Sequence, residues 1–225
     1  MKPERDPPPG ARRLAAWLDE WHLERRLQAA DPDAQPARRA PIRYPAPRAG
    51  AAVRAGQIRL LPPATPATAA RPVYVAVLAP AGPERWQVAP FGRFATPALP
   101  GEYATRRRAL PLSVLCAWNA GVAGAALLRA SYPAGRLTAA ERRACGALLA
   151  VAGGGAPPPA DVARRTGPPL VHPLDPRHAY VEEERALWLE IGAAAAAPGG
   201  ARPFDELRLA AEEPEGRYGK KGSGG

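Results

Sequence analysis

The stretch RPVYVAVLAPAGPERWQVAPFGRF, residues 71–94, contains two apolar segments joined by turn-forming residues. Residues 73–79, VYVAVLA, are β-branched and aromatic, and their nearly continuous apolar character predicts a strand buried on both faces. After the AGPE turn, RWQVAPF at 85–91 predicts a second strand, which Pro90 ends or places at a sheet edge. GQIRLL at 56–61 alternates apolar and polar residues like a half-buried strand, so the three segments predict an antiparallel sheet.

Four apolar residues near the N-terminus recur at the spacing of one helical face and predict an amphipathic helix over about residues 12–30. They are Leu14, Trp17, Leu18 and Trp21. Farther along the chain, Thr138 and Glu141 have the spacing of a capping box, which predicts a helix ending at the glycines of 153–155.

Three weaker patterns complete the expected fold. Residues 112–116 predict an extended segment, a short helix should follow to about Arg129, and residues 181–192 predict the last ordered element. The expected fold class is α+β, with a small antiparallel barrel or strongly bent sheet near residues 55–118 and helices packed on it.

Composition suggests one core domain with long loops and tails. The 225 residues include 30 prolines and 22 glycines, which is typical of extensive irregular structure. We expect a polar tail, the amphipathic helix and a Pro/Arg-rich linker over 1–54, the core over 55–191, and a disordered C-terminal tail over 192–225.

The net charge of +10 favours a polyanionic partner, but its origin has two interpretations. Arginine accounts for 28 of the 31 basic residues, a bias that a GC-rich genome also produces through its codons. Residues 55–150 carry 11 basic and 3 acidic residues, an excess of eight. The charge is therefore concentrated in the predicted core domain.

The remaining composition predicts a cytoplasmic protein without a membrane span. Cys116 and Cys145 are too few and too far apart for a disulfide framework or a zinc pair, so both are expected to be reduced thiols. The N-terminus has acidic residues and prolines where a signal peptide has an apolar run. No stretch approaches the ~18 apolar residues of a transmembrane helix.

The order GQIRLL, RPVYVAVL and WQVAP resembles the beginning of the PemK/MazF-like toxin family over residues 56–92. The resemblance implies an SH3-like barrel, usually dimeric, that acts on RNA as a metal-independent endoribonuclease of bacterial type. It also implies that Arg71, in the Arg-Pro step, stabilises charge that develops at the phosphorus. The family's Ser or Thr after the Ala-Pro step has no equivalent, because Phe91 and Gly92 follow Pro90.

A basic segment offers a candidate surface for nucleic acid. A phosphate-contacting strip with one stacking aromatic is expected from Arg93, Tyr103, Arg106, Arg107 and Arg108, although exposed arginines also serve solubility. The expected function is a toxin-like module that binds or cleaves RNA, and the sequence leaves the enzyme assignment open.

The alternative function is a non-catalytic protein-interaction module. It would use the barrel surface and the Leu14, Trp17, Leu18 and Trp21 stripe as anchors for a partner. His172, Asp175 and His178 have ligand chemistry, but Pro173 and Pro176 interrupt a regular helix between them, so no metal site is predicted. No nucleotide or dinucleotide fingerprint occurs, and no cofactor is predicted.

Overall fold

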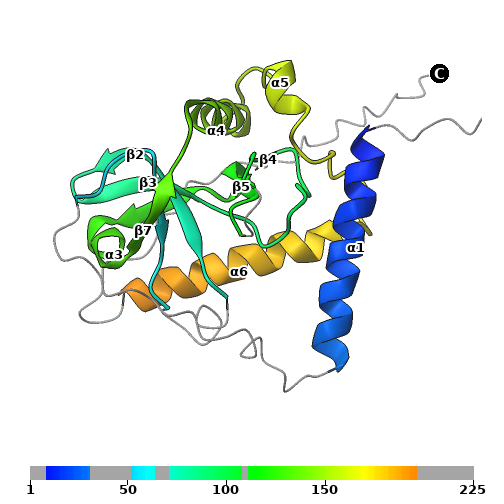
Figure 1. Cartoon of the computed structure of the whole chain (residues 1–225), viewed down its shortest axis with the longest axis horizontal. Coiled ribbons are helices and arrows are strands. Elements are labelled where there is room, and N and C mark those ends of the chain that lie inside the picture. Colours follow the sequence, from blue (N-terminus) through cyan, green and yellow to red (C-terminus); the bar gives the residue numbers. More distant parts are fainter. Residues whose placement is uncertain (1–8, 31–51, 64–70, 108–110, 197–225) are drawn as a thin grey trace, which may run out of the picture.

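The structure is a computed structural model that describes residues 9–30, 52–63, 71–107 and 111–196. Its centre is a five-stranded antiparallel sheet in the order β6-β3-β2-β1-β7 (Figure 1). The strands are β1 (Gln57–Leu60), β2 (Tyr74–Gly82), β3 (Arg85–Pro90), β6 (Gly121–Gly124) and β7 (Tyr132–Arg136). The α+β prediction is confirmed, and the described strands form an open sheet and not a closed barrel.

The hairpin β2–β3 forms the middle of this sheet from the stretch that first indicated strands. Val77 faces Val88 across the pair, and two register irregularities follow toward the turn. The turn holds Glu84 at φ 54°, a left-handed conformation that is uncommon for residues other than glycine. The carbonyl of Glu84 accepts a hydrogen bond from Ala125 N at 2.8 Å, which connects the turn to the first residue of helix α3 (Ala125–Ala130).

Away from its turn, the hairpin is buried on both faces, as the continuous apolar character of residues 73–79 predicted. Val75, Val77 and Val88 pack in one cluster, whereas Ala76 and Ala89 pack in another. Because neighbouring residues of a strand point to opposite faces, this division means that one apolar run supplies two cores. Each core needs its own covering helix.

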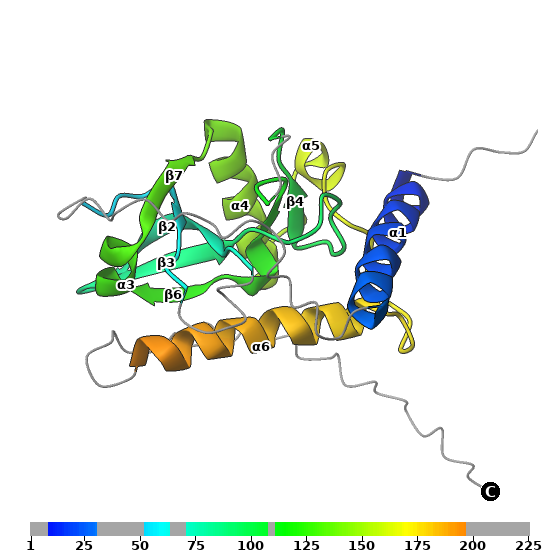
Figure 2. The same cartoon turned by 60° about the horizontal axis from the view of Figure 1, so that its bottom comes forward.

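Helix α4 (Ala139–Ala152) covers one face, and helix α6 (Arg177–Ala196) covers the other (Figures 1 and 2). Cys145 and Leu148 of α4 are buried with Ala76 and Ala89. Ile191 of α6 is buried with the valines of the opposite face. The sheet is thus the middle layer of three.

The capping box predicted for α4 is present. Thr138 Oγ1 accepts from Glu141 N at 3.2 Å, and Glu141 Oε2 accepts from Thr138 N at 2.7 Å. These two bonds satisfy backbone donors that the first turn of a helix leaves without partners. Local sequence therefore decides where α4 begins.

Smaller elements complete one edge of the domain. A two-stranded sheet pairs β4 (Glu102–Ala104) with β5 (Val114–Cys116), and the short helix η2 (Ala117–Asn119) follows. Helix α3 (Ala125–Ala130) lies between β6 and β7, and α5 (Ala160–Ala163) follows α4. Strands β6 and β7 were not predicted. The helix expected after residue 116 to about Arg129 is wrong in its first half, where η2 and β6 form and β6 pairs with β3, so the helix covers only Ala125–Ala130.

Helix α1 (Pro9–Ala30) crosses the N-terminal end of α6 (Figure 2). The predicted apolar face points inward: Trp17 is 0% exposed and Trp21 is 5% exposed. The two indoles stack with ring centroids 5.4 Å apart and meet Phe94 and Tyr180 at their edges. The N-terminal helix is therefore part of the core of the domain.

Three predicted segments lie outside the described residues: the N-terminal tail before position 9, most of the linker (31–51) and the C-terminal tail from 197. Within the described ranges, none of the helices combines the length and the apolarity needed to cross a bilayer.

Gly167 and Gly146 give a matched test of the packing. A Cβ at Gly167 would lie 2.4 Å from the backbone atoms Ala98 C and Leu99 N, whereas a Cβ at Gly146 in α4 would meet nothing within 4 Å. We expect Gly167→Ala to lower the free energy of unfolding by about 2–3 kcal/mol through overpacking. Gly146→Ala should raise it by about 0.5–1 kcal/mol through helix propensity. Urea unfolding measures both, and a Gly167→Ala protein as stable as the wild type would contradict this packing.

Candidate nucleic-acid interface

The candidate residues fall into two separate places in the structure. Arg71 and Arg93 lie with the N-terminal helix on the α6 side of the domain. Tyr103, Arg106 and Arg107 line a cleft on the α4 side, and Arg108 lies outside the described residues. The structure therefore does not bring the predicted basic strip together as one surface.

Arg71 is held by a carboxylate of α6. Its Nη2 donates to both oxygens of Glu184 at 2.8 Å, and Glu184 is 3% exposed. Burial opposes the charge of Arg71, but contact with Glu184 outweighs that effect and raises the pKa of the guanidinium. In this arrangement Arg71 connects the sheet to α6, and its catalytic role stays a prediction.

Arg93 lies at the centre of an acidic and aromatic cluster. Its Nη2 lies 2.6 Å from Glu183, and its Nε lies 3.2 Å from Glu24. The guanidinium carbon is 4.9 Å from the ring centroid of Phe94 and 5.6 Å from that of Tyr180. Carboxylates from both α1 and α6 thus neutralise this arginine, which leaves little of its charge for a phosphate.

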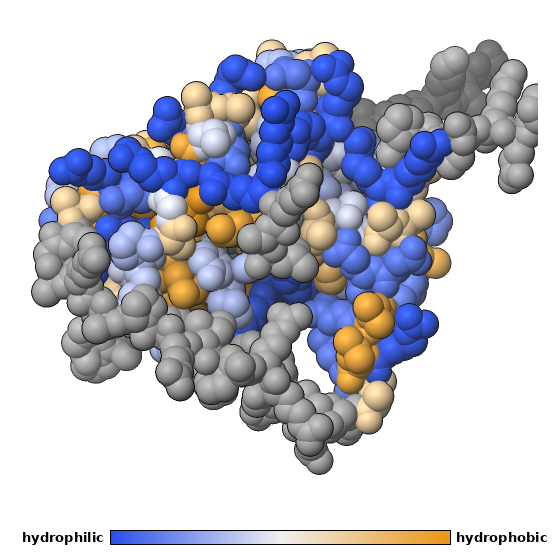
Figure 3. Space-filling view, in the orientation of Figure 1, coloured by the Kyte–Doolittle hydropathy of each residue, from blue (hydrophilic) through white to orange (hydrophobic). Residues whose placement is uncertain are grey.

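The predicted partner-binding stripe is covered by the chain itself. Trp17 and Trp21 are buried, and Leu14 and Leu18 are partly buried against the same cluster. The exposed apolar residues of α1 are instead Leu23 and Leu27, which form the hydrophobic patch over that helix in Figure 3. A partner could reach the predicted stripe only after α1 leaves the domain.

Glu102 forms a buried hydrogen-bonded group behind the small sheet. Its Oε1 accepts from Trp118 Nε1 and from Tyr180 Oη, both at 2.9 Å, and its Oε2 accepts from Ala98 N at 2.5 Å. Burial raises the pKa of Glu102 to about 7, although these three donors act in the opposite direction. The Glu102 side chain joins β4, η2 and α6.

Cys116 and the histidine segment carry no further site chemistry. Burial raises the pKa of the Cys116 thiol well above its ordinary value, so the thiol is unreactive as a nucleophile. Asp175 is committed to Arg177, whose Nη2 lies 2.6 Å from its carboxylate. No group of three ligating side chains that could hold a metal occurs in the described ranges.

The cleft on the α4 side has a volume of about 570 Å³. Its walls come from the segment after β4, from the first turns of α4, and from α5 with the residues after it. Five arginines line it: Arg106, Arg107, Arg143, Arg164 and Arg165. The acidic lining residues are Glu141 and Asp161, so the lining carries an excess of three positive charges.

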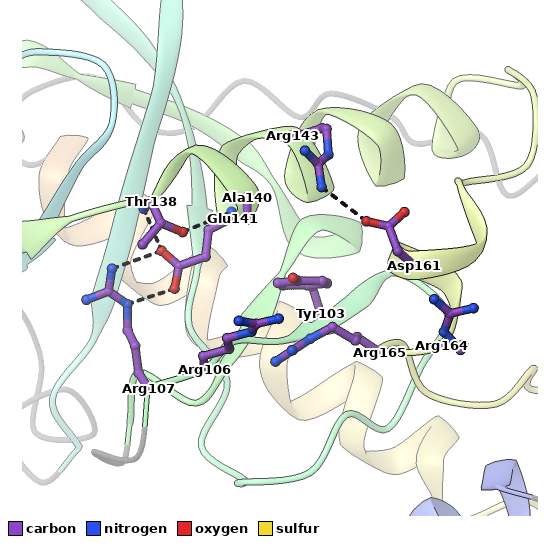
Figure 4. A pocket seen from close by; sticks show the side chains of 10 residues that line it. All are labelled: Tyr103, Arg106, Arg107, Thr138, Ala140, Glu141, Arg143, Asp161, Arg164 and Arg165. Atoms are coloured by element: carbon purple, nitrogen blue, oxygen red, sulfur yellow. Dashed lines mark hydrogen bonds and ion pairs between the residues drawn. The ribbon is translucent and has the colours of Figure 1, made fainter.

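Two of the five arginines are neutralised within the cleft wall. Arg107 donates from Nε and Nη2 to the two oxygens of Glu141, both at 2.9 Å. Arg143 Nη2 lies 3.1 Å from Asp161. Figure 4 shows that Arg107 turns away toward Glu141, whereas Arg106 lies beside Arg165.

The other three guanidinium groups keep their charge uncompensated among the described residues. Arg165 donates to the neutral carbonyls of Ala104 and Thr105 at 2.7 and 2.8 Å. Arg106 and Arg164 are exposed, and their side chains form no hydrogen bond or ion pair with the part of the chain that is described. Adjacent uncompensated guanidinium groups favour an anion between them.

Tyr103 forms the floor of the same cleft. The Arg165 guanidinium carbon lies 5.1 Å from the centroid of its ring, which is a cation–π contact. This contact covers the ring face, and Tyr103 is only 7% exposed, so the predicted stacking of a base on this ring is not available in the structure. Its hydroxyl has no hydrogen bond to another described residue.

Sequence reasoning named Tyr103, Arg106 and Arg107 but missed Arg143, Arg164 and Arg165. The pairs Arg142–Arg143 and Arg164–Arg165 are visible in the sequence. In a chain with 28 arginines, however, two more pairs carry little signal. Only the approach of α4 and α5 to β4 brings them to one cleft.

The comparisons with known proteins add no family assignment. No family model, no curated protein and no solved structure matches the chain. The resemblance to PemK/MazF-like toxins therefore stays a prediction.

The raised pKa of Glu102 makes the stability of the folded protein depend on pH, and the direction of the change follows from the direction of the shift. The pKa of Glu102 is raised from 4.5 to about 7 in the folded state. The folded protein therefore binds more protons than the unfolded chain between these values, and its stability falls as pH rises through that range. At about 1.4 kcal/mol per pKa unit the loss is roughly 3 kcal/mol. We expect Glu102→Gln to remove this loss in chemical unfolding measured from pH 4 to pH 8.

Glu141→Gln is the matched control, because the stability that Glu141 contributes changes with pH in the opposite direction. Burial raises the pKa of Glu141, but contact with Arg107 and Thr138 outweighs burial and lowers it. Its contribution to stability is present above the ordinary carboxyl range and is lost as pH falls through the lowered value. Identical pH profiles for the wild type and Glu102→Gln between pH 4.5 and pH 7 would refute the assignment for Glu102.

Proposed function

We propose that the protein binds single-stranded RNA through the basic cleft between β4, α4 and α5. The observation that supports the proposal is the set of three uncompensated guanidinium groups, Arg106, Arg164 and Arg165, in one cleft. Guanidinium groups recognise phosphate oxygens with directed, charge-assisted hydrogen bonds. The cleft therefore has the chemistry of a phosphate site.

RNA is preferred over other polyanions for two reasons. The cleft lining carries an excess of three positive charges, opposite in sign to a nucleic-acid backbone. The order of the strand sequences resembles a family that acts on RNA. Because the lining offers guanidinium groups and the hydroxyls of Tyr103 and Thr138, binding uses phosphate groups and is independent of base sequence.

Cleavage is a separate question from binding. Arg71, the residue implied by the resemblance, donates to Glu184 on the far side of the domain from the cleft. Incubating RNA in EDTA with the wild type and with Arg71→Ala addresses it directly. Cleavage by the wild type alone would assign Arg71 a role in the cleavage reaction. Intact RNA in both samples would mean that the protein binds RNA without cleaving it.

Salt dependence tests the binding proposal. Each phosphate contact on a single strand contributes about −0.7 to the slope of log K against log salt, so three contacts predict a slope of about −2. Arg106→Ala and Arg164→Ala should each weaken binding and reduce the magnitude of the slope by about 0.7. Fluorescence anisotropy with a labelled oligoribonucleotide measures both quantities.

Arg129→Ala is the control for net charge. Arg129 is exposed on α3 and pairs with Glu84, away from the cleft, so its removal changes the total charge by the same amount. A loss of affinity equal to that of Arg106→Ala would show that binding follows net charge and would refute the cleft as the site.

A further inference from the structure

The cleft is compact, and this property restricts what it can hold. Its volume of about 570 Å³ lies within the ~300–1,000 Å³ of typical small-ligand pockets. Grooves that follow a single strand instead distribute their contacts over about 4–16 nucleotides. The charge of this cleft is concentrated at one position, so it suits one strongly charged group better than a run of phosphates.

Two of the three uncompensated groups lie side by side. In Figure 4 Arg106 and Arg165 lie next to each other beside Tyr103, whereas Arg164 lies apart from them, below Asp161. Arg165 is fixed by two backbone carbonyls and by the ring of Tyr103, so its position does not depend on a ligand. Arg106 and Arg164 are exposed and can close on a ligand from either side.

Two anions on RNA differ in how well they match this arrangement. A phosphodiester carries one negative charge and offers two non-bridging oxygens. A terminal phosphomonoester carries about −1.5 to −2 at pH 7 and offers three acceptor oxygens. Three uncompensated guanidinium groups and the Tyr103 hydroxyl suit the second anion better than the first, because it has more negative charge and more acceptor oxygens.

We infer that the cleft binds the terminal phosphomonoester of an RNA strand, with Arg106, Arg164 and the Tyr103 hydroxyl as its donors and Arg165 as the fixed member of the set. This inference rests on the proposed RNA binding and makes it more specific. Arg107 is a positioning residue, because its guanidinium is bound to Glu141 and orients the segment that carries Arg106.

The experiment compares three oligoribonucleotides of one sequence: one with hydroxyls at both ends, one with a 5′ phosphate and one with a 3′ phosphate. Charge-assisted hydrogen bonds contribute enough that a phosphorylated end should bind roughly tenfold more tightly. The end that gives the gain identifies the strand terminus. A nucleoside monophosphate should compete for the site, whereas the matching nucleoside should not.

Variants of the lining residues show which side chains produce the tighter binding of the phosphorylated end. Arg106→Ala and Arg164→Ala should each remove most of the preference for the phosphorylated end, and Tyr103→Phe should reduce it about threefold while keeping the ring beneath Arg165. Arg129→Ala should leave the ratio of the two affinities unchanged. Circular dichroism and thermal unfolding confirm that each variant is folded.

The outcomes separate the two proposals. Equal affinities for all three oligonucleotides, with salt-dependent binding retained, would overturn the preference for an end and leave RNA binding in place. A full preference in Arg106→Ala would overturn the assignment of the site. No binding of any oligonucleotide would overturn both proposals.

Discussion

The position of Arg93 is the constraint on which the arrangement of the two long helices depends. Its guanidinium meets carboxylates from α1 and from α6 and lies over the rings that fill the space between them. The Arg93 side chain is only 14% exposed, so loss of either carboxylate would leave part of its charge uncompensated between the two helices. Arg71 and Glu184 repeat the principle one step along α6. The N-terminal helix is thereby part of the domain.

The three-layer arrangement explains why the arginine-lined cleft lies on the α4 side. The hairpin β2–β3 is apolar on both faces, so each face needs a helix, and α6 and α4 supply them. On the face that α6 covers, Glu183 and Glu184 neutralise Arg93 and Arg71. Covering by α4 leaves its first turn next to β4, where Glu141 neutralises Arg107 alone. The three uncompensated arginines that line the cleft, Arg106, Arg164 and Arg165, are therefore on the α4 side (Figure 4).

Much of the fold could be predicted because its signals are local. The spacing of Trp17 and Trp21 predicted the apolar face of α1 but not its burial in the domain, and Thr138 with Glu141 predicted the start of α4. The continuous apolar run of β2 predicted a strand buried on both sides. Strands β6 and β7 were missed because residues 121–124 fell within a predicted helix and YPAGR contains residues that usually break strands. They form because β3 and β1 each pair with β2 along one edge and leave the other edge for β6 and β7.

By itself the sequence determined the periodicities, the helix cap and the excess of arginine, all of which arise within a few neighbouring residues. The tertiary structure alone decided which arginines are paired with a carboxylate. Arg71 and Glu184 are 113 residues apart, and Arg107 and Glu141 are 34 apart, so no local pattern could pair them. The same holds for the cleft, whose walls come from three distant segments. An arginine's charge is available to a ligand only where folding brings no carboxylate to it, and that depends on packing between elements.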